Sequence, residues 1–487
     1  MTTVISYLVT ILISEARDNT IIETSATQQV RPFMVKFLQN KITIWSAWSN
    51  ASTNRKIFAA TLTVSSLTLV VKFVTMGKEL AIAHQFGVGE VLDAFMIAYI
   101  LPSMAINVLA GSFNSAMMPT FIEVSDNKDH KAAQQLFSSV LTLGIVFLSL
   151  CSIILAVLAP VVLPILGSGF EPTTLALTQS LFYWLLPVIV LQGVALLYAT
   201  VINAKERFAL VALTPIITPL FTIVLILFLS QTRWDIYALV GGMVLGSVLE
   251  LLFLSRILSR QGIIVTPKWF GMTPELHQVV RQYSPMVAGA FLMSSTVLVD
   301  QAMAAMLEPG SVAALGYANK LVSLILGLGA LALGTAVLPH FSRMVAQKDW
   351  TALRHTVTKY TYLIVWVTVP LAAILFFFSE FIVGLLFERG AFTHEDTVLV
   401  GQIQAFYVLQ VPFYVLGLLM ARIISSLKKN YLLMWGACIS LLLNIIFNFV
   451  FMQWIGIAGI ALSTAIVYFS SFAFLSFGFR KSIEKLS

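Results

Sequence analysis

The feature that most constrains this chain is a long run of apolar residues that recurs about twelve times between Ile57 and Phe479. About twenty apolar residues in a helix span the hydrocarbon core of a bilayer, so each run predicts a membrane-spanning helix. Backbone groups cannot stay unbonded at that depth, and the runs lack the alternation of an outer-membrane β-barrel strand. Only 10% of the 487 residues are charged, against about 25% in soluble chains. The sequence therefore predicts an all-α polytopic membrane protein.

The predicted spans lie between polar breaks in the sequence. They fall near residues 57–76, 92–116, 136–158, 178–202, 208–230, 235–255, 284–306, 312–338, 359–379, 398–421, 431–453 and 456–479. Prolines interrupt several of them, at positions 102, 187, 215, 219, 370 and 412. Each proline marks either a simple kink or a water-filled cavity, and both interpretations stay open.

Basic residues gather on alternate loops. These loops hold Lys128, Lys131, Lys205, Arg207, Arg256, Arg260, Lys268, Arg281, Arg343, Lys348, Arg354, Lys359, Arg422, Lys428, Lys429, Arg480, Lys481 and Lys485. The opposite loops hold only Arg233 and Arg389. With Arg55 and Lys56 before the first span, this bias places both termini in the cytoplasm and requires an even number of spans. The basic residues that set this orientation explain the net charge of +7. The sequence has no basic soluble domain that would indicate nucleic-acid binding.

The segment 1–56 differs from the rest and is expected to be a cytoplasmic tail. Its apolar stretch from Val4 to Ser14 is too short to span and lacks a basic region before it and a small-residue cleavage site after it. It is therefore not interpreted as a signal peptide. A mobile amphipathic tail and a true start at Met34 both remain open.

The two halves of the chain look duplicated. A span opens at Gly89 and ends near Pro119, and another opens at Gly310 and ends near Pro339, each about 30 residues long. Six spans per half is an even number, so both halves insert the same way up. The prediction is two six-helix lobes, residues 57–270 and 271–487, related by an axis along the membrane normal and enclosing a shared cleft. Such lobes transport by alternating access, whereas a duplicated scaffold for partners is the alternative.

Three lysines fall within or beside the spans: Lys72, Lys78 and Lys320. A charge at the centre of a span costs about 2.5–3.5 kcal/mol, so each is expected to face a cavity or a partner. A salt bridge to an acid and an open cationic site are both consistent with the sequence. An excess of lysines over acids would favour an anionic ligand such as a pyrophosphate headgroup.

The acids in similar settings are Glu79, Asp93 and Asp300, while Glu250 and Glu380 lie near span ends and are interpreted as structural. The repeat places Glu79 at the position of Asp300. It also places Lys320, beside Asn319, on the helix that pairs with the one carrying Asp93. If the acids dominated, Asp93 and Asp300 would be ligands for a coupling proton or sodium ion.

Catalytic and cofactor signatures are missing from the sequence. Cys151 and Cys438 sit singly in apolar runs and the six histidines are scattered, so neither a metal site, a cofactor nor a disulfide is predicted. No hydrolase, protease or nucleotide-binding motif occurs. The chain is expected not to be an enzyme, and transport would use an ion gradient, the membrane potential or the gradient of the substrate.

Three stretches resemble the MurJ/MviN family of lipid II flippases, within the superfamily of multidrug, oligosaccharidyl-lipid and polysaccharide exporters. They are Gly87 to Pro102, Gly111 to Pro119, and Leu386 to Thr393 with Asp396-Thr397. The resemblance covers roughly residues 68–481. It implies two lobes around a cationic cavity that holds the pyrophosphate of a lipid-linked sugar while the polyprenyl tail stays in the bilayer.

The resemblance also implies roles for particular residues. Lys72 and Lys78 stand where the family has arginines, and Glu79 stands where it has Asp. Asp93 matches directly, and Asn319-Lys320 replaces an Asp-Arg pair.

Other positions depart from the family pattern. Where the family has two consecutive arginines on the second span, this sequence has Ala105 and Ile106. Ala110 stands where the family has a Glu. The family usually has two further C-terminal spans that form a groove for the lipid tail, whereas about twelve spans are predicted in this sequence. A polyprenyl-linked saccharide other than lipid II, for a surface polymer, therefore stays open as the substrate.

The expected function is a flippase for lipid-linked cell-wall or surface-polysaccharide precursors in the bacterial cytoplasmic membrane, acting as a monomer. Lys72, Lys78 and Lys320 would bind the pyrophosphate, and Asp93 with Glu79 would orient or release them. The alternative is a cation-coupled small-molecule exporter of the same architecture that uses Asp93 and Asp300.

Overall fold

The computed structural model describes residues 53–127, 129–229, 235–336, 341, 344–345, 347–427 and 429–484. The segment predicted as a tail lies almost wholly outside these residues, as do Arg233 and the predicted end of the second repeat at Pro339. Within the described part the regular structure is helical and contains no strand, which confirms the all-α prediction.

The described residues form a series of helices along the chain. They are α3 (Thr53–Phe86), α4 (Glu90–Ala105), the π-helical turn η1 (Ile106–Ala110), α5 (Gly111–Asn127), α6 (His130–Leu166), α7 (Pro172–Ala204), α8 (Phe208–Leu213), the 3₁₀ turn η2 (Thr214–Ile216), α9 (Ile217–Leu229), α10 (Asp235–Arg260), α11 (Pro274–Ala304), α12 (Ser311–Ala336), α14 (Trp350–Phe377), α15 (Ser379–Phe387), α16 (His394–Val408), α17 (Gln410–Ser426), α18 (Asn430–Ile455) and α19 (Ile457–Glu484).

Ten of the described helical segments are long and apolar enough to cross a membrane. Each of the twelve predicted spans overlaps a described helix or a pair of helices that follow one another. α3 and α12, which carry the three lysines, fall outside the ten, and the apolar part of α12 is the shorter segment Ser311–Gly327. Crossing by these two helices stays a prediction.

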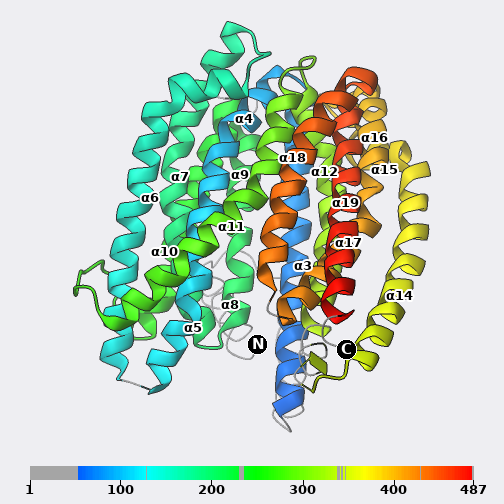
Figure 1. Ribbon diagram of the computed structural model, residues 1–487. Coiled ribbons are helices and arrows are strands. Elements are labelled where there is room, and N and C mark those ends of the chain that lie inside the picture. Colours follow the sequence, from blue (N-terminus) through cyan, green and yellow to red (C-terminus); the bar gives the residue numbers. More distant parts are fainter. Residues whose placement is uncertain are drawn as a thin grey trace, which may run out of the picture.

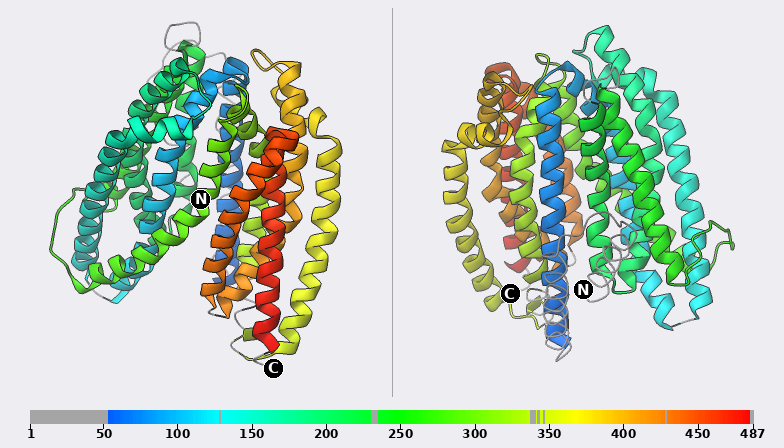
Figure 2. Two further views of the ribbon diagram at one scale, coloured as in Figure 1. Left: turned by 45° about the horizontal axis from the view of Figure 1, so that its top comes forward. Right: turned by 180° about the vertical axis from the view of Figure 1, so that it is seen from behind.

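The helices form two groups that lie side by side (Figures 1 and 2). The first bundle holds α4 to α10 and the second bundle holds α14 to α19. Between them lie three helices that contact both groups: α3 packs on α9 and α15, α11 on α5 and α18, and α12 on α4 and α16. The lobe boundary predicted at residue 270 stays a prediction, because α11 packs on helices of both halves of the chain.

Prolines explain two of the helix breaks. Pro412 cannot bond to the carbonyl of Val408, and α16 ends at Val408. Pro219 likewise leaves the carbonyl of Pro215 without its helical donor, and the 3₁₀ turn η2 lies there, just before α9. Pro187, in contrast, lies inside the unbroken helix α7.

The two halves of the chain meet closely at the end of the molecule opposite the C-terminal end of α19 (Figure 1). Here the turn between α3 and α4 lies against the turn between α15 and α16, and the Ala391 N–H donates to the His84 carbonyl at 2.8 Å. Gly87 has a φ of +57°, and a Cβ there would lie 2.3 Å from the Ala391 oxygen. Glycine is therefore required at this contact. The motifs that carried the family resemblance at Gly87 and Gly390 form this closed end.

Candidate functional site

The centre of the candidate site is an ion triad between the two halves of the chain. Lys78 Nζ lies 3.0 Å from Glu79 Oε1 on α3, and Lys320 Nζ of α12 lies 3.2 Å from the same oxygen. The Glu79 side chain is 6% exposed, whereas that of Lys320 is 41% exposed. One carboxylate faces two ammonium groups, so the triad keeps a net positive charge with one lysine open to its surroundings.

Lys72 lies on the same helix, six residues before Lys78, which is about 9 Å along the axis. Its side chain is exposed, and no acid pairs with it among the described residues. It adds a second positive charge below the triad. Three of the predicted binding residues, Lys78, Glu79 and Lys320, are thus in direct contact, whereas no ion pair in the described part of the chain joins Lys72 to them.

Asn319 does not join the triad. Its Oδ1 accepts a hydrogen bond at 3.1 Å from Ser323 on its own helix. Asn319 therefore supports the surface of α12 beside Lys320, and the structure shows no bond from it to α3.

Asp93 makes its bonds at the closed end of the molecule. Its carboxylate accepts from the Gly310 N–H at 2.6 Å and from the Ala313 N–H at 2.7 Å. These are among the first amides of α12, which have no helical acceptor, and a negative charge there is favoured by the helix dipole. Asp93 of α4 thus caps a helix from the other half of the chain.

Asp300 occupies a separate polar cluster in the second half of the chain. Its Oδ1 accepts from Asn444 Nδ2 at 2.9 Å and from Asn448 Nδ2 at 2.7 Å, both on α18. All three side chains are buried, and the amide oxygens of both asparagines have no hydrogen-bond partner. Sequence reasoning missed the two asparagines, because a search for charges overlooks neutral amides.

A family model described as lipid II flippase MurJ matches residues 82–487. The chain belongs to the MurJ family of lipid II flippases. The matched range begins after Lys72, Lys78 and Glu79, so the assignment of these residues rests on their geometry and not on the family match.

Known relatives agree with the MurJ assignment. The chain is similar to a probable lipid II flippase MurJ from Thermotoga maritima, with 28% identity over 434 residues that cover 87% of this chain and 86% of the relative. A solved structure of lipid II flippase MurJ in an inward closed conformation has a TM-score of 0.74 at 24% identity, covering 88% of this chain and 90% of that one. An inward-facing transporter of the multidrug MATE family has a TM-score of 0.72 at 13% identity, covering 88% and 98%. The two structures show that the fold is shared.

Two tyrosines near the triad were not predicted. Tyr99 and Tyr317 lie close enough to Glu79 to interact with it electrostatically. Tyr317 is fully buried, its ring lies 5.3 Å from that of Phe387, and its hydroxyl has no hydrogen-bond partner. Tyr317 precedes Lys320 by three residues, which is one helical turn, so the spacing was the only available signal.

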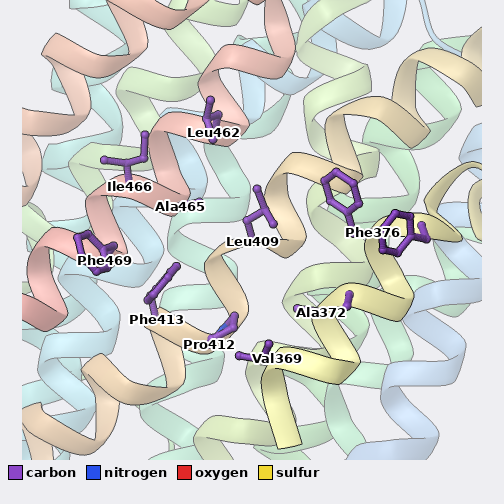
Figure 3. Close-up of a pocket in the computed structure, with 12 residues that line it drawn as sticks. Val369, Ala372, Phe376, Leu409, Pro412, Phe413, Leu462, Ala465, Ile466 and Phe469 are labelled. Atoms are coloured by element: carbon purple, nitrogen blue, oxygen red, sulfur yellow. The ribbon is translucent and has the colours of Figure 1, made fainter. Parts of the chain in front are cut away.

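A cavity of about 590 Å³ lies in the second bundle, between α14, α17 and α19. Figure 3 shows its lining side chains, including Phe376, Phe413 and Phe469, and all of them are apolar. A charged headgroup would lose its hydration there without gaining a partner. The cavity therefore suits a hydrocarbon chain, and the lysine triad is the candidate site for a charged headgroup in this member of the MurJ family.

Proposed function

We propose that this chain is a flippase that moves a polyprenyl-pyrophosphate-linked saccharide precursor across the cytoplasmic membrane. The observation that carries the proposal is that Lys78 and Lys320, from opposite halves of the chain, share the single carboxylate of Glu79. The uncompensated positive charge suits a pyrophosphate, which is strongly negative. The relatives named lipid II flippase indicate the substrate class.

In the binding step, pyrophosphate oxygens replace Glu79 as partners of the lysines. Lys320 is the more exposed of the two paired lysines and meets the headgroup first. Lys72, about two helical turns before Lys78 on α3, is proposed to add its charge through its long flexible side chain. Because an ammonium group is a point charge without the planar fork of arginine, recognition is mainly electrostatic and weakens as salt rises.

Alternating access links this step to the closed end. Asp93 caps α12 at Gly310 and Ala313, and Lys320 lies seven residues further along the same helix, about 10 Å from Ala313. When the closed end opens, α12 moves away from α4 and draws Lys320 away from Glu79, which releases the headgroup. We thus assign Asp93 to closure of the external end and not to the substrate.

We also propose that both termini of the chain lie in the cytoplasm. The basic loop clusters support this orientation, and α3 begins and α19 ends at the same end of the molecule (Figure 1). Twelve crossings, two lobes at residues 57–270 and 271–487, and a monomer complete the proposal.

A cation at Asp300 is the proposed coupling ion. Rotating the amides of Asn444 and Asn448 by half a turn would direct two oxygens toward the carboxylate, because amide oxygen and nitrogen are nearly interchangeable in size. One carboxylate with neutral oxygens suits a monovalent ion such as sodium. This cluster also favours the second candidate function, a cation-coupled exporter of small molecules.

The experiment that separates the two functions uses the purified chain in vesicles. A fluorescent lipid with a pyrophosphate-linked saccharide and a small cationic dye are offered in parallel, with and without a sodium gradient. The flippase proposal expects translocation of the lipid alone. Transport of the dye without lipid movement, abolished in Asp300→Asn, would replace it by the exporter.

A further inference from the structure

Glu250 is an acid within a membrane-spanning helix that neither the lysine triad nor the Asp300 cluster uses. It lies in α10, about 22 Å along the axis from Asp235. Thr218 Oγ1 of α9 donates a hydrogen bond to Glu250 Oε2 at 3.1 Å. The side chain is partly buried, and within the described part of the chain no Lys, Arg or His pairs with it.

The helices packed around Glu250 offer it no countercharge. α9 and η2 contain no titratable residue, nor does α8 beyond them. α7 contributes only the hydroxyls of Tyr183 and Tyr198, and Glu90 and Asp93 of α4 lie at the closed end. Arg256, six residues further along α10, is the nearest cation on its own helix. Within the described residues, the hydrogen bond from Thr218 is the polar contact of the Glu250 carboxyl group.

The partner of Glu250 lies just beyond a break in the helix. η2 interrupts the span between α8 and α9, and Thr218 is the second residue of α9, between Pro215 and Pro219. α9 and α10 are in very close contact there, because a Cβ added at Gly246 would lie 2.6 Å from Thr218 Cα. The Glu250 side chain points back toward this contact along its helix.

The broken helix connects Glu250 to the lysine helix. α8, η2 and α9 all pack on α3, which carries Lys72, Lys78 and Glu79. A change in the bond between α10 and α9 therefore acts on an element in direct contact with α3. Broken helices of this kind are the segments that transporters rearrange.

We propose that Glu250 is a proton-binding site whose charge state controls the packing of α8–α9 against α10 and α3. The ionised carboxylate accepts a charge-assisted bond from Thr218, and such a bond is about twice as strong as a neutral one. Proton uptake converts Glu250 into a neutral acid and weakens its hydrogen bond with Thr218 of α9. The broken helix can then move relative to α10. A carboxylate and one hydroxyl supply too few oxygens for a metal ion, so a proton is the fitting ligand.

The site deepens the proposed flippase cycle and rests on it only for its effect on transport. If Glu250 were merely structural, Gln would serve equally well, because its amide oxygen still accepts from Thr218. The substitution Glu250→Gln therefore distinguishes the two roles without removing the hydrogen bond.

The test is infrared difference spectroscopy of the whole purified chain in lipid, titrated between about pH 5 and about pH 9, together with lipid flipping across the same range. We expect a protonated-carboxyl band that titrates in the parent protein and in Glu123→Gln, an exposed control, and that is lost in Glu250→Gln. Thr218→Val removes the donor that favours the ionised form, so the midpoint of the band moves to higher pH. Flipping changes roughly tenfold with pH in the parent and less than about twofold in Glu250→Gln.

A band unaltered in Glu250→Gln, or a flipping rate with the same pH dependence in that variant and the parent, would overturn the proposal. A titrating Glu250 band in a protein that moves no lipid would support the proton site and refute the flippase. The spectroscopic readout needs no substrate, so the two failures are distinguishable.

Discussion

Glu79 is the acid that both Lys78 and Lys320 contact, and its side chain is more buried than either lysine. A carboxylate placed between two ammonium groups stabilises their proximity while leaving an excess of positive charge. A pyrophosphate that displaces Glu79 meets lysines that are already in position. We therefore propose that Glu79 substitutes for the negative charge of the substrate when no substrate is bound.

Glu79→Gln should destabilise the protein and impair flipping. The change removes two ion pairs and leaves two like charges near each other, at a cost of about 1–3 kcal/mol given the partial exposure of the lysines. The melting temperature in detergent is expected to fall and to recover partly when pyrophosphate is added. Glu123→Gln, on the exposed surface of α5, should change neither quantity. A Glu79→Gln protein as stable as the parent would contradict the role of the triad.

Part of this site could be predicted from the sequence, because charged residues are rare and conspicuous in apolar spans. Lys78, Glu79 and Lys320 were found in this way. That Lys320 and Glu79 touch depends on the packing of α3 against α12, which no local pattern reports. The contact of Asp93 with the N-terminal end of α12 could not be predicted for the same reason, since that helix end lies more than 200 residues away.

Among the elements, the turns of the closed end carry the most demanding geometry. Gly87, Gly310 and Gly390 all have positive φ and all contact backbone or side chains from the other half of the chain. The helix positions were predictable from apolar runs, and both proline-induced breaks follow from local chemistry. Which turns would face each other was not predictable, because the repeat indicates a symmetry relation between the two halves and not which residues meet across it.

Gly87→Ala should weaken the closed end. The added methyl group meets the Ala391 carbonyl in a backbone conformation that alanine resists, at a cost of about 1–3 kcal/mol. Gly89→Ala is the matched control two residues away, where nothing lies within 4 Å. Thermal unfolding of both variants measures the difference. Equal melting temperatures would show that this contact does not hold the two halves together.

Gly242→Ala tests the packing of α10 on α9 in a similar way. Its methyl group would lie 2.5 Å from Thr222 Cα, whereas that of Gly241→Ala would lie 3.7 Å from its nearest neighbour, in ordinary contact. Forcing the helices apart is expected to cost about 1–3 kcal/mol. Denaturation in mixed micelles should show Gly242→Ala alone to be destabilised, and destabilisation of Gly241→Ala to the same extent would contradict this account of the interface.

At the scale of the whole molecule, the two halves of the chain are joined at the closed end by hydrogen bonds to backbone groups and, about 10 Å further along α12, by the ion pairs of the triad. The closed end and the lysine site share α12, which carries the cap of Asp93 and the ammonium group of Lys320. Motion of α12 relative to α3 and α4 would therefore change both the closed end and the lysine site. An open and a closed arrangement of the two halves would then differ in which partner the lysines contact.

Asp93→Asn should open the closed end. Asn has one acceptor where Asp has two, and its amide donor faces a backbone donor, at a cost of about 1–3 kcal/mol. Spin labels at positions 171 and 308, in a chain with Cys151 and Cys438 replaced by serine, report the distance between the halves at that end. The variant should show a larger population of long distances, whereas Asp126→Asn, on the exposed end of α5, should match the parent. Identical distance distributions in Asp93→Asn and the parent would contradict the proposal that Asp93 holds the closed end together.

The most direct test of the central claim is the rate at which vesicles containing the purified chain move a fluorescent polyprenyl-pyrophosphate saccharide, measured with Lys72, Lys78 and Lys320 replaced together by Gln. Lys429→Gln, which changes a basic residue between α17 and α18, is the control. We expect the triple variant to fold but to lose flipping, while the control retains the parent rate. A triple variant that flips the lipid as fast as the parent would contradict this expectation.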